Sequence, residues 1–160
     1  MSRARPSVLF VCLGNICRSP LAEAALRAEA ARIGLDVEVD SAGTGDWHVG
    51  GPPDRRAQAV ARRHGIDISG YRARLVEPED FRRFDQIVAL DANNLAVLRR
   101  MAPDDTRARL SLLLDHVPGR AGEPVADPYQ GSDEGFDVTW ADVSAGAQGL
   151  ARELAGKAMA

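Results

Sequence analysis

The sequence predicts an α/β fold in which one domain contains a four-stranded parallel sheet with helices on both faces. Short apolar runs alternate along the chain with helical patterns, and this alternation is typical of parallel strands joined by right-handed crossover helices. The length of 160 residues suits one domain with a substantial core, and no linker rich in Ser, Gly or Pro divides the chain. We therefore expect residues 1–160 to form a single domain.

Four short apolar runs are predicted to be the buried strands of this sheet. They are rich in Val, Leu and Ile and are bounded by turn residues, as expected for strands covered on both faces. The predicted strands span residues 8–11, 37–40, 86–90 and 110–114.

Helical patterns fill the intervals between these runs. Residues 20–33 are rich in Ala and end at Gly34, and we expect Ser19 to be the N-cap and Pro20 the first helical residue. Further helices are predicted at residues 53–64 and 93–101. Near the C-terminus an apolar stripe with spacings of three and four residues predicts a long helix that packs on the core. The stripe consists of Phe136, Trp140, Val143, Ala147, Leu150 and Leu154.

The turn after the first strand carries a cysteine and an arginine, Cys12 and Arg18, with five residues between them. Gly14 and Asn15 are residue types that tolerate positive φ, so the chain can wrap tightly before the helix begins. Backbone N–H groups and the dipole of a helix N-terminus favour a bound dianion. Ligands of parallel sheets bind beyond the carboxyl ends of the strands, which is where this turn lies. The turn therefore indicates a phosphate-binding loop.

The side chains of this loop suit nucleophilic chemistry on phosphorus. A cysteine over a helix N-terminus and beside a guanidinium is stabilised as a thiolate, so we expect Cys12 to be a nucleophile. The planar fork of Arg18 matches two phosphate oxygens. Ser19 can donate its hydroxyl to the thiolate. The alternative, a structural cysteine buried at a strand end, explains neither the arginine nor the Ser-Pro pair.

These residues resemble a known family, the low-molecular-weight protein tyrosine phosphatases of the bacterial type, whose active-site loop is reproduced by residues 12–20. The resemblance covers nearly the whole chain and extends to Ser41 to Thr44, Pro52 to Asp54, Arg56, His64, Gly65, Phe84 to Val88, Asp91 and Asp127 to Tyr129. It implies a flavodoxin-like fold of the phosphotyrosine phosphatase I type. It also implies hydrolysis of phosphotyrosine and other aryl phosphates through a phosphocysteine intermediate.

Displacement of a phenolate or alkoxide from phosphorus needs an acid for the leaving oxygen. Asp127 is our candidate, in a segment rich in Gly, Pro and Asp that spans residues 119–135. Pro128 restricts Asp127 to an extended conformation and so aims its carboxylate. By residue type alone, an Asp-Pro pair in a loop is more often a turn former. The resemblance implies that Asp127 is the general acid.

Substrate binding is assigned to the loop and to two aromatic residues. The set is Leu13, Gly14, Asn15, Ile16, Cys17, Trp47 and Tyr129. Trp47 lies in a glycine-punctuated loop over residues 45–51, where a flat ring can pack on a phosphorylated ring or against its own loop. The resemblance favours a pocket wall.

Asn15, Ser19 and Ser41 are predicted to support the loop. In the family the residue matching Asn15 hydrogen-bonds the serine matching Ser41, which keeps the loop in its anion-binding shape. From the residues alone, Ser41 is equally well a turn hydroxyl at a strand end.

Three other functions share parts of this pattern. Arsenate reductases have the same fold and loop but need further cysteines, and this chain has none after Cys17. Protein arginine phosphatases resemble the chain more closely, but they carry a threonine where this loop has Ile16. A module that binds phosphotyrosine without turnover needs neither the nucleophile Cys12 nor the acid Asp127.

Cys17 has two interpretations. Under peroxide it can form a disulfide with Cys12 that protects the nucleophile from overoxidation. Equally, it can be a small thiol packed beneath the loop. Irreversible loss of activity under peroxide in the native chain, matching the loss in Cys17→Ser, would remove the disulfide hypothesis.

Composition limits the partners and the compartment. A net charge of −3 argues against a general nucleic-acid binder, and no apolar run approaches the roughly 18 residues of a membrane span. The only cysteines are Cys12 and Cys17, which argues for a reducing compartment, the cytoplasm. His48, His64 and His116 are scattered singly, so no metal site is expected. We expect no cofactor and a monomer that takes a phosphotyrosine-bearing protein or small aryl phosphate and releases phosphate.

Overall fold

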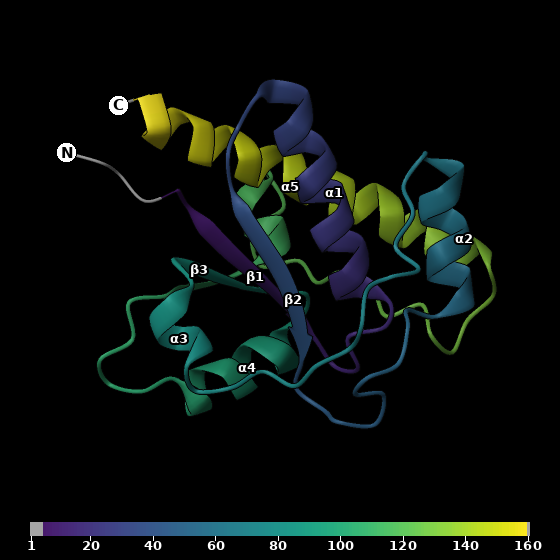
Figure 1. The fold of residues 1–160 in the computed structure, drawn as a ribbon, viewed down its shortest axis with the longest axis horizontal. Helices are drawn as coiled ribbons and strands as arrows, with labels where there is room; N and C mark the ends of the chain where they lie inside the picture. Colours follow the sequence, from purple (N-terminus) through teal and green to yellow (C-terminus); the bar gives the residue numbers. More distant parts are fainter. Residues whose placement is uncertain (1–4, 160) are drawn as a thin grey trace.

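The computed structural model describes residues 5–159 and has a four-stranded parallel sheet with helices on both faces (Figure 1). The predicted fold class is therefore confirmed. The single-domain prediction for residues 1–160 extends past the described residues. The strands are β1 (Ser7–Cys12), β2 (Glu38–Gly43), β3 (Gln86–Ala89) and β4 (Arg109–Leu112), and their order in the sheet is β2-β1-β3-β4.

The strand order determines where a ligand site can form. β1 is central and buried along its whole length, and it pairs with β2 on one side and β3 on the other. The chain leaves β1 in one direction to form β2 and returns across it to form β3. This reversal opens a crevice beyond the carboxyl end of β1, which is the point where Cys12 ends the strand.

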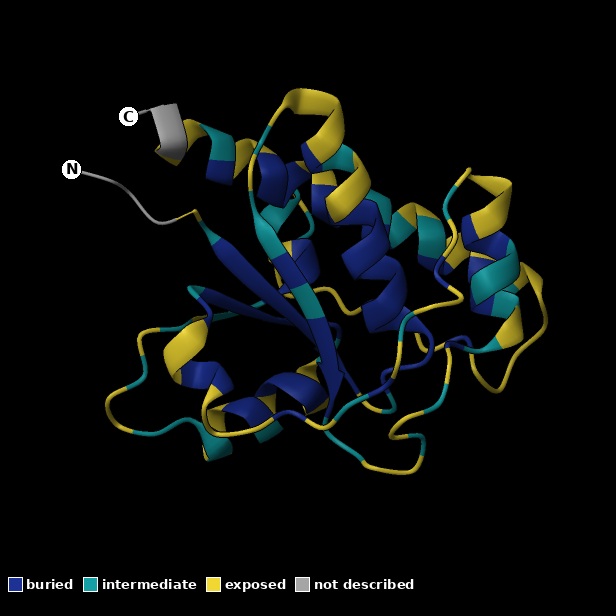
Figure 2. Cartoon of the chain, viewed as in Figure 1, coloured by how far each residue is buried: buried dark blue, intermediate teal, exposed yellow. Residues whose placement is uncertain are grey.

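Alternate residues of the strands contribute to two separate cores, because successive side chains of a strand point to opposite faces. Val8 and Phe10 of β1 face a core with α1 (Arg18–Ile33), α2 (Arg55–Arg63) and α5 (Glu134–Met159). Leu9 and Val11 face a second core with α3 (Asp80–Arg83) and α4 (Ala92–Met101). Figure 2 shows the buried sheet between these two helical layers.

The long C-terminal helix predicted from the apolar stripe is present as α5. α5 packs against α1 and crosses behind it in the view of Figure 1, and every member of the stripe is buried except Trp140, which is half-buried. Gly149 permits a close approach here, since a Cβ at this position would lie 2.0 Å from the carbonyl oxygen of His116. No helix among residues 5–159 is both long and apolar enough to cross a membrane.

Two helix starts differ from the prediction by two residues, and α4 begins one residue early, at Ala92. α1 begins at Arg18 with Cys17 at the N-cap, so the expected cap at Ser19 is wrong, and no side chain caps this helix. The hydroxyl of Ser19 is used instead within the preceding loop. α2 begins at Arg55 rather than residue 53, because the Asp54 side chain accepts a hydrogen bond from the Arg56 N–H and caps the helix there.

Smaller differences concern the second half of the sheet. β4 ends at Leu112, and a short 3₁₀ helix, η1 (Leu113–His116), replaces the predicted end of the strand. The Asp115 carboxylate accepts the Leu112 N–H at 2.9 Å and turns the chain at this point. α3 was not predicted, since it is a single turn without a periodic pattern. Residues 117–133 form no helix or strand, which agrees with the predicted irregular loop up to the start of α5.

Candidate active site

The loop from Cys12 to Arg18 is buried apart from its Leu13–Gly14 tip. Asn15 has φ 57° and is the only non-glycine residue with positive φ in the described part of the chain. The end of β2 is a glycine for a steric reason: a Cβ on Gly43 would lie 2.8 Å from the Leu13 carbonyl oxygen. The strand therefore lets the loop pack directly on its backbone.

Asn15 organises the loop from behind. The Arg74 backbone N–H donates to Asn15 Oδ1 at 3.0 Å, which fixes the amide so that its nitrogen faces two serines. Asn15 Nδ2 donates to Ser19 Oγ at 2.8 Å and to Ser41 Oγ at 3.0 Å. The predicted bond between Asn15 and Ser41 is thus present. Asn15 is absent from the residues that line the cavity, and its hydrogen bonds agree with the predicted support of the loop. Its placement among the substrate-binding residues stays a prediction.

The two serines extend this hydrogen-bond network to Glu23 and to Cys12. Because each hydroxyl accepts from Asn15, its own proton points elsewhere. Ser41 donates to Glu23 Oε1 at 2.8 Å. Ser19 Oγ lies 3.0 Å from Cys12 Sγ, so by the same logic Ser19 donates to the sulfur. A hydrogen bond from a neutral hydroxyl favours a thiolate without adding charge to the site.

Glu23 is the far end of this network. Its carboxylate is buried, and besides the Ser41 bond it accepts Arg27 Nε at 3.0 Å. Burial raises the pKa of Glu23 above its ordinary value, and the bonds from Ser41 and Arg27 offset only part of that effect. Its role behind the loop was not predicted.

Arg18 is held by groups from two other segments. Its Nη1 donates to Asp91 Oδ2 at 2.7 Å and to the Val125 carbonyl oxygen at 3.0 Å. Asp91 also caps α4 by accepting the Asn94 N–H at 2.8 Å. Sequence reasoning assigned no role to Asp91, although it follows β3 beside the carboxyl end of β1. A backbone carbonyl such as that of Val125 leaves no sequence signal.

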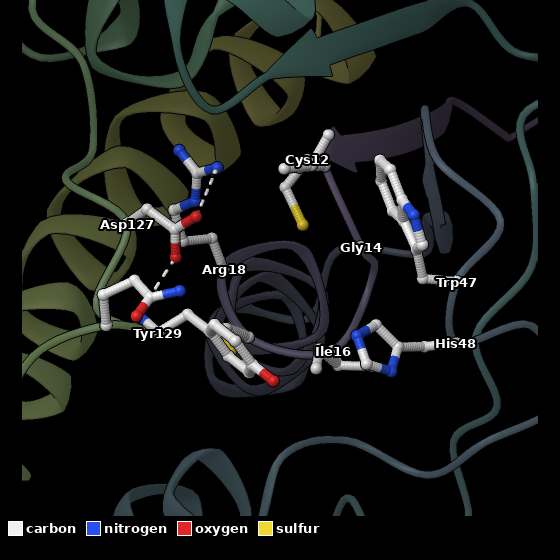
Figure 3. Close-up of a pocket in the computed structure, with 11 residues that line it drawn as sticks. Cys12, Gly14, Ile16, Arg18, Trp47, His48, Asp127 and Tyr129 are labelled. Carbon is white, nitrogen blue, oxygen red and sulfur yellow. Dashed lines mark hydrogen bonds and ion pairs between the residues drawn. The ribbon is translucent and has the colours of Figure 1, made fainter.

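Asp127 lies beside Arg18, on the opposite side of the cavity from Trp47, as Figure 3 shows. Its Oδ2 is 3.5 Å from Arg18 Nη2, and its side chain is 43% exposed. Oδ1 accepts the Tyr129 backbone N–H at 3.1 Å, which is the turn-forming bond typical of aspartate. One oxygen of Asp127 therefore shapes the turn and the other pairs with Arg18. The role of Asp127 as the general acid stays a prediction.

A cavity of about 400 Å³ joins these groups, and the Cys12 sulfur points into it (Figure 3). All predicted substrate-binding residues except Asn15 line it. Two residues that were not predicted, His48 and Gln130, also line it. Each follows a predicted aromatic residue in the chain, which was the available signal. The lining consists of Cys12, Leu13, Gly14, Ile16, Cys17, Arg18, Trp47, His48, Asp127, Tyr129 and Gln130.

The aromatic walls are exposed and rest on glycines. Trp47 is 69% exposed, and its indole covers Gly45 so closely that a Cβ there would lie 1.8 Å from the ring. Trp47 thus packs on its own loop while it forms one side of the cavity. The His48 ring lies beside Gly14 and 6.3 Å from the Tyr129 ring centroid. Three rings, those of Trp47, His48 and Tyr129, therefore line the cavity, with the His48 and Tyr129 rings tilted by 59° to each other.

Cys17 is free and buried on the cavity side of the loop. Burial, followed by the carboxylate of Asp54 and the sulfur of Cys12, raises the pKa of the Cys17 thiol far above its ordinary value. Cys17 is therefore protonated at neutral pH. The disulfide with Cys12 stays a prediction.

Two histidines that could bind a metal, His64 and His116, make other contacts. Among residues 5–159 no group of three His, Cys, Asp or Glu side chains is arranged to hold a metal ion. The His64 ring stacks on Trp140 at 4.8 Å. His116 bonds Ser111 through Nε2 at 2.9 Å and Glu153 through Nδ1 at 2.8 Å.

Comparison with known proteins places this site in a family. Residues 7–159 match the family model of low molecular weight phosphotyrosine protein phosphatases. The chain is 49% identical over 125 residues to low molecular weight protein-tyrosine-phosphatase YfkJ of Bacillus subtilis, covering 77% of this chain and 80% of the relative. It is 47% identical over 148 residues to a low molecular weight protein-tyrosine-phosphatase of Streptomyces coelicolor, covering 89% and 90%.

Solved structures of similar proteins have the same fold. The crystal structure of YfkJ superposes with a TM-score of 0.90 at 41% identity, covering 97% of this chain and 98% of that one. The Drosophila arginine phosphatase DARP gives a TM-score of 0.86 at 33% identity, covering 91% and 96%. The chain therefore belongs to the low molecular weight phosphotyrosine protein phosphatase family, and it is a cysteine-dependent protein tyrosine phosphatase.

Proposed function

We propose that this phosphatase hydrolyses phosphotyrosine on proteins, as well as small aryl phosphates, through a phosphocysteine at Cys12. The observation that supports this most strongly is the convergence of three groups on one cavity: the Cys12 sulfur, the Arg18 guanidinium and the Asp127 carboxyl group. Each supplies something that phosphate ester cleavage requires, namely a nucleophile, a positive field and an acid.

In the first step the Cys12 thiolate attacks phosphorus in line with the leaving oxygen. Loop N–H groups and Arg18 bind the equatorial oxygens. Since Nη1 of Arg18 is engaged by Asp91 and Val125, the Nε and Nη2 edge is assigned to the phosphate. The S–P bond forms as the P–O bond breaks, and the departing phenolate oxygen takes the proton of Asp127.

In the second step Asp127, now a carboxylate, accepts a proton from water as that water attacks phosphorus. The S–P bond breaks, phosphate leaves, and the sulfur retains the electron pair as a thiolate. The Ser19 hydroxyl, 3.0 Å from Cys12 Sγ, stabilises that charge. Arg18 and the loop amides provide the positive field, so this route needs no metal or cofactor.

The walls of the cavity support an aryl substrate. Trp47 and Tyr129 present exposed aromatic rings, and Leu13 and Ile16 add apolar surface from the Cys12–Arg18 loop itself. Ile16 suits a phenyl ring better than a guanidinium, which favours phosphotyrosine over phosphoarginine. We assign the enzyme to the cytoplasm, a compartment that its two cysteines suit, and we take it to act as a monomer.

The experiment compares turnover of para-nitrophenyl phosphate by the native enzyme and two variants. Cys12→Ser should abolish turnover, and Asp127→Ala should lower it by about 10² to 10⁴-fold, the range for loss of a general acid. Asp133→Ala, which removes an exposed carboxylate from the same irregular segment, is the matched control. Full activity in Cys12→Ser would refute the mechanism.

Substrate choice is tested with peptides of one sequence that carry phosphotyrosine, phosphoserine or phosphoarginine. The fastest phosphate release should come from phosphotyrosine. A preference for phosphoarginine would assign the substrate class named for the similar Drosophila structure. Calorimetric binding of the phosphotyrosine peptide without phosphate release would favour a binding module.

A further inference from the structure

Arg56 at the start of α2 uses its guanidinium to join two segments. Nε and Nη2 each donate at 3.1 Å to the two oxygens of Asp54, a fork-to-fork pair. Nη2 also donates to the Tyr129 carbonyl oxygen at 2.9 Å, and Nη1 donates to that of Gly131 at 3.0 Å. One side chain therefore binds its own helix cap and two carbonyls of the segment that carries Asp127.

The guanidinium is fixed in orientation by what surrounds it. It lies over the Phe136 ring at 4.6 Å from the centroid, and Phe136 is buried at the start of α5. The side chain of Arg56 is only 20% exposed, and that of Asp54 14%. Hydrogen bonds from Arg56 lower the pKa of Asp54 below its ordinary value despite the opposing effect of burial. The pair is therefore a charged, oriented unit at neutral pH.

Arg56 and Arg18 hold the two ends of the short span that contains Asp127. At one end Arg18 donates to the Val125 carbonyl oxygen, and the Val125 N–H donates to the Leu90 carbonyl oxygen at 2.8 Å. At the other end Arg56 binds the Tyr129 carbonyl oxygen. Asp127 lies midway between these points. An arginine thus fixes the backbone on each side of the acid.

Asp54, the partner of Arg56, also contacts the loop from Cys12 to Arg18. The backbone N–H of Asp54 donates to the Ile16 carbonyl oxygen at 2.8 Å, and Ile16 lies between Cys12 and Arg18 in that loop. The contacts from Ile16 through Asp54 and Arg56 to Tyr129 form a direct connection between the segment that carries the nucleophile and the segment that carries the acid.

We propose that Arg56 is a positioning residue that sets the distance of the Asp127 carboxyl group from the leaving oxygen, through its bonds to Asp54, Tyr129 and Gly131. This inference rests on the proposed function, in which Asp127 is the general acid. Arg56 itself contacts no reacting atom. Its loss lets the Tyr129 end of the span move, and proton transfer depends steeply on such displacements.

The test measures kcat/KM for a series of aryl phosphates whose leaving phenols differ in basicity. This parameter reports the steps up to departure of the phenol, and only basic phenols need the acid. Arg56→Ala should lower kcat/KM about tenfold for phenyl phosphate and less than about twofold for dinitrophenyl phosphate. Arg55→Ala, which removes the exposed neighbouring arginine, should leave the series unchanged.

Two further variants separate positioning from folding. Asp54→Asn keeps an oxygen for the helix cap but loses the charged fork, so it should steepen the dependence on phenol basicity in the same direction as Arg56→Ala, and by less. In an Asp127→Ala background, Arg56→Ala should add no further dependence on phenol basicity, because the acid is already absent. Thermal unfolding of each variant reports its folding directly.

The outcomes distinguish failure of the Arg56 positioning role from failure of the proposed function. A uniform decrease for all aryl phosphates in Arg56→Ala, or no decrease, would overturn the positioning role while leaving Asp127 as the acid. If Asp127→Ala itself shows no dependence on phenol basicity, the proposed function fails first.

Discussion

The two halves of the catalytic site are built in opposite ways. The nucleophile loop is buried, with an Arg18 side chain only 3% exposed, and its shape is set by neutral hydrogen bonds centred on Asn15. The segment of Asp127 lies in an irregular stretch on the surface, and the Asp127 side chain is 43% exposed. Figure 2 shows this contrast between the buried end of the sheet and the exposed loops beyond it.

This difference follows from what each half must do. A loop that binds a dianion has to present its N–H groups before the substrate arrives, so its donors are fixed by groups that do not compete for the phosphate. In the proposed function Asp127 exchanges protons with water, which requires contact with solvent. Its segment is therefore open, and arginine side chains fix it at separate points rather than along its length.

Among the contacts that connect the two halves, the largest expected effect comes from Arg18, which touches both. Arg18→Lys keeps the charge but loses the planar fork, so it cannot bind the phosphate and hold Asp91 and Val125 together. We expect kcat/KM for para-nitrophenyl phosphate to fall by about 10³-fold, comparable to the loss of an oriented oxyanion donor. A lysine variant within tenfold of the native value would show that charge alone is sufficient.

A smaller effect is expected from Asn15, which acts only on the buried half. Asn15→Ala removes three hydrogen bonds and places an alanine at positive φ. The free energy of unfolding should fall by about 2 to 3 kcal/mol and kcat/KM by about tenfold. Urea unfolding and steady-state kinetics measure both, with Asn93→Ala on the exposed surface of α4 as the control. Unchanged kinetics would mean that Ser19 and the loop hold their shape without Asn15.

The smallest effect is a pH dependence of stability that originates at Glu23. Its pKa is raised in the folded protein, so the unfolded chain releases the proton first as pH rises. Folding stability from Glu23 is therefore complete below the ordinary glutamate pKa and is lost as pH rises through the folded value. Urea unfolding between pH 4 and 8 should show the native protein losing stability relative to Glu23→Gln. The opposite trend would indicate that Ser41 and Arg27 outweigh burial.

The fold was predictable because its pattern is carried by many residues at once. The alternation of apolar runs and helices specifies the sheet, and no single side chain decides it. Element ends depend on individual hydrogen bonds, and there the prediction was less accurate. Ser19 has the sequence signature of an N-cap, but its hydroxyl is engaged by Asn15 and Cys12, so the helix starts earlier without a side-chain cap.

The convergence of the site was predictable where several residues at a fixed spacing point to the same chemistry, as Cys12 and Arg18 do, or where the resemblance decides between alternatives, as it does for Asp127. Cys12, Arg18 and Asp127 converge on one cavity as the sequence and the resemblance implied. The groups that hold Arg18 and the Asp127 segment from a distance were not predicted, because a side chain bound to a distant carbonyl leaves no local pattern. The contacts of Arg56 with Tyr129 and of Arg18 with Val125 are examples, and both depend on how an irregular segment folds back.

Asp91 connects the phosphate site to the start of α4. One of its oxygens accepts the Asn94 N–H at the first turn of the helix, and the other accepts Arg18. A ligand that draws Arg18 into a fixed position therefore also orders the carboxylate that starts α4. By thermodynamic reciprocity, the free energy by which a bound anion stabilises the first turn of α4 through Asp91 equals the free energy by which that ordered turn strengthens anion binding. A helix that touches no substrate thus shares in the affinity of the phosphate site.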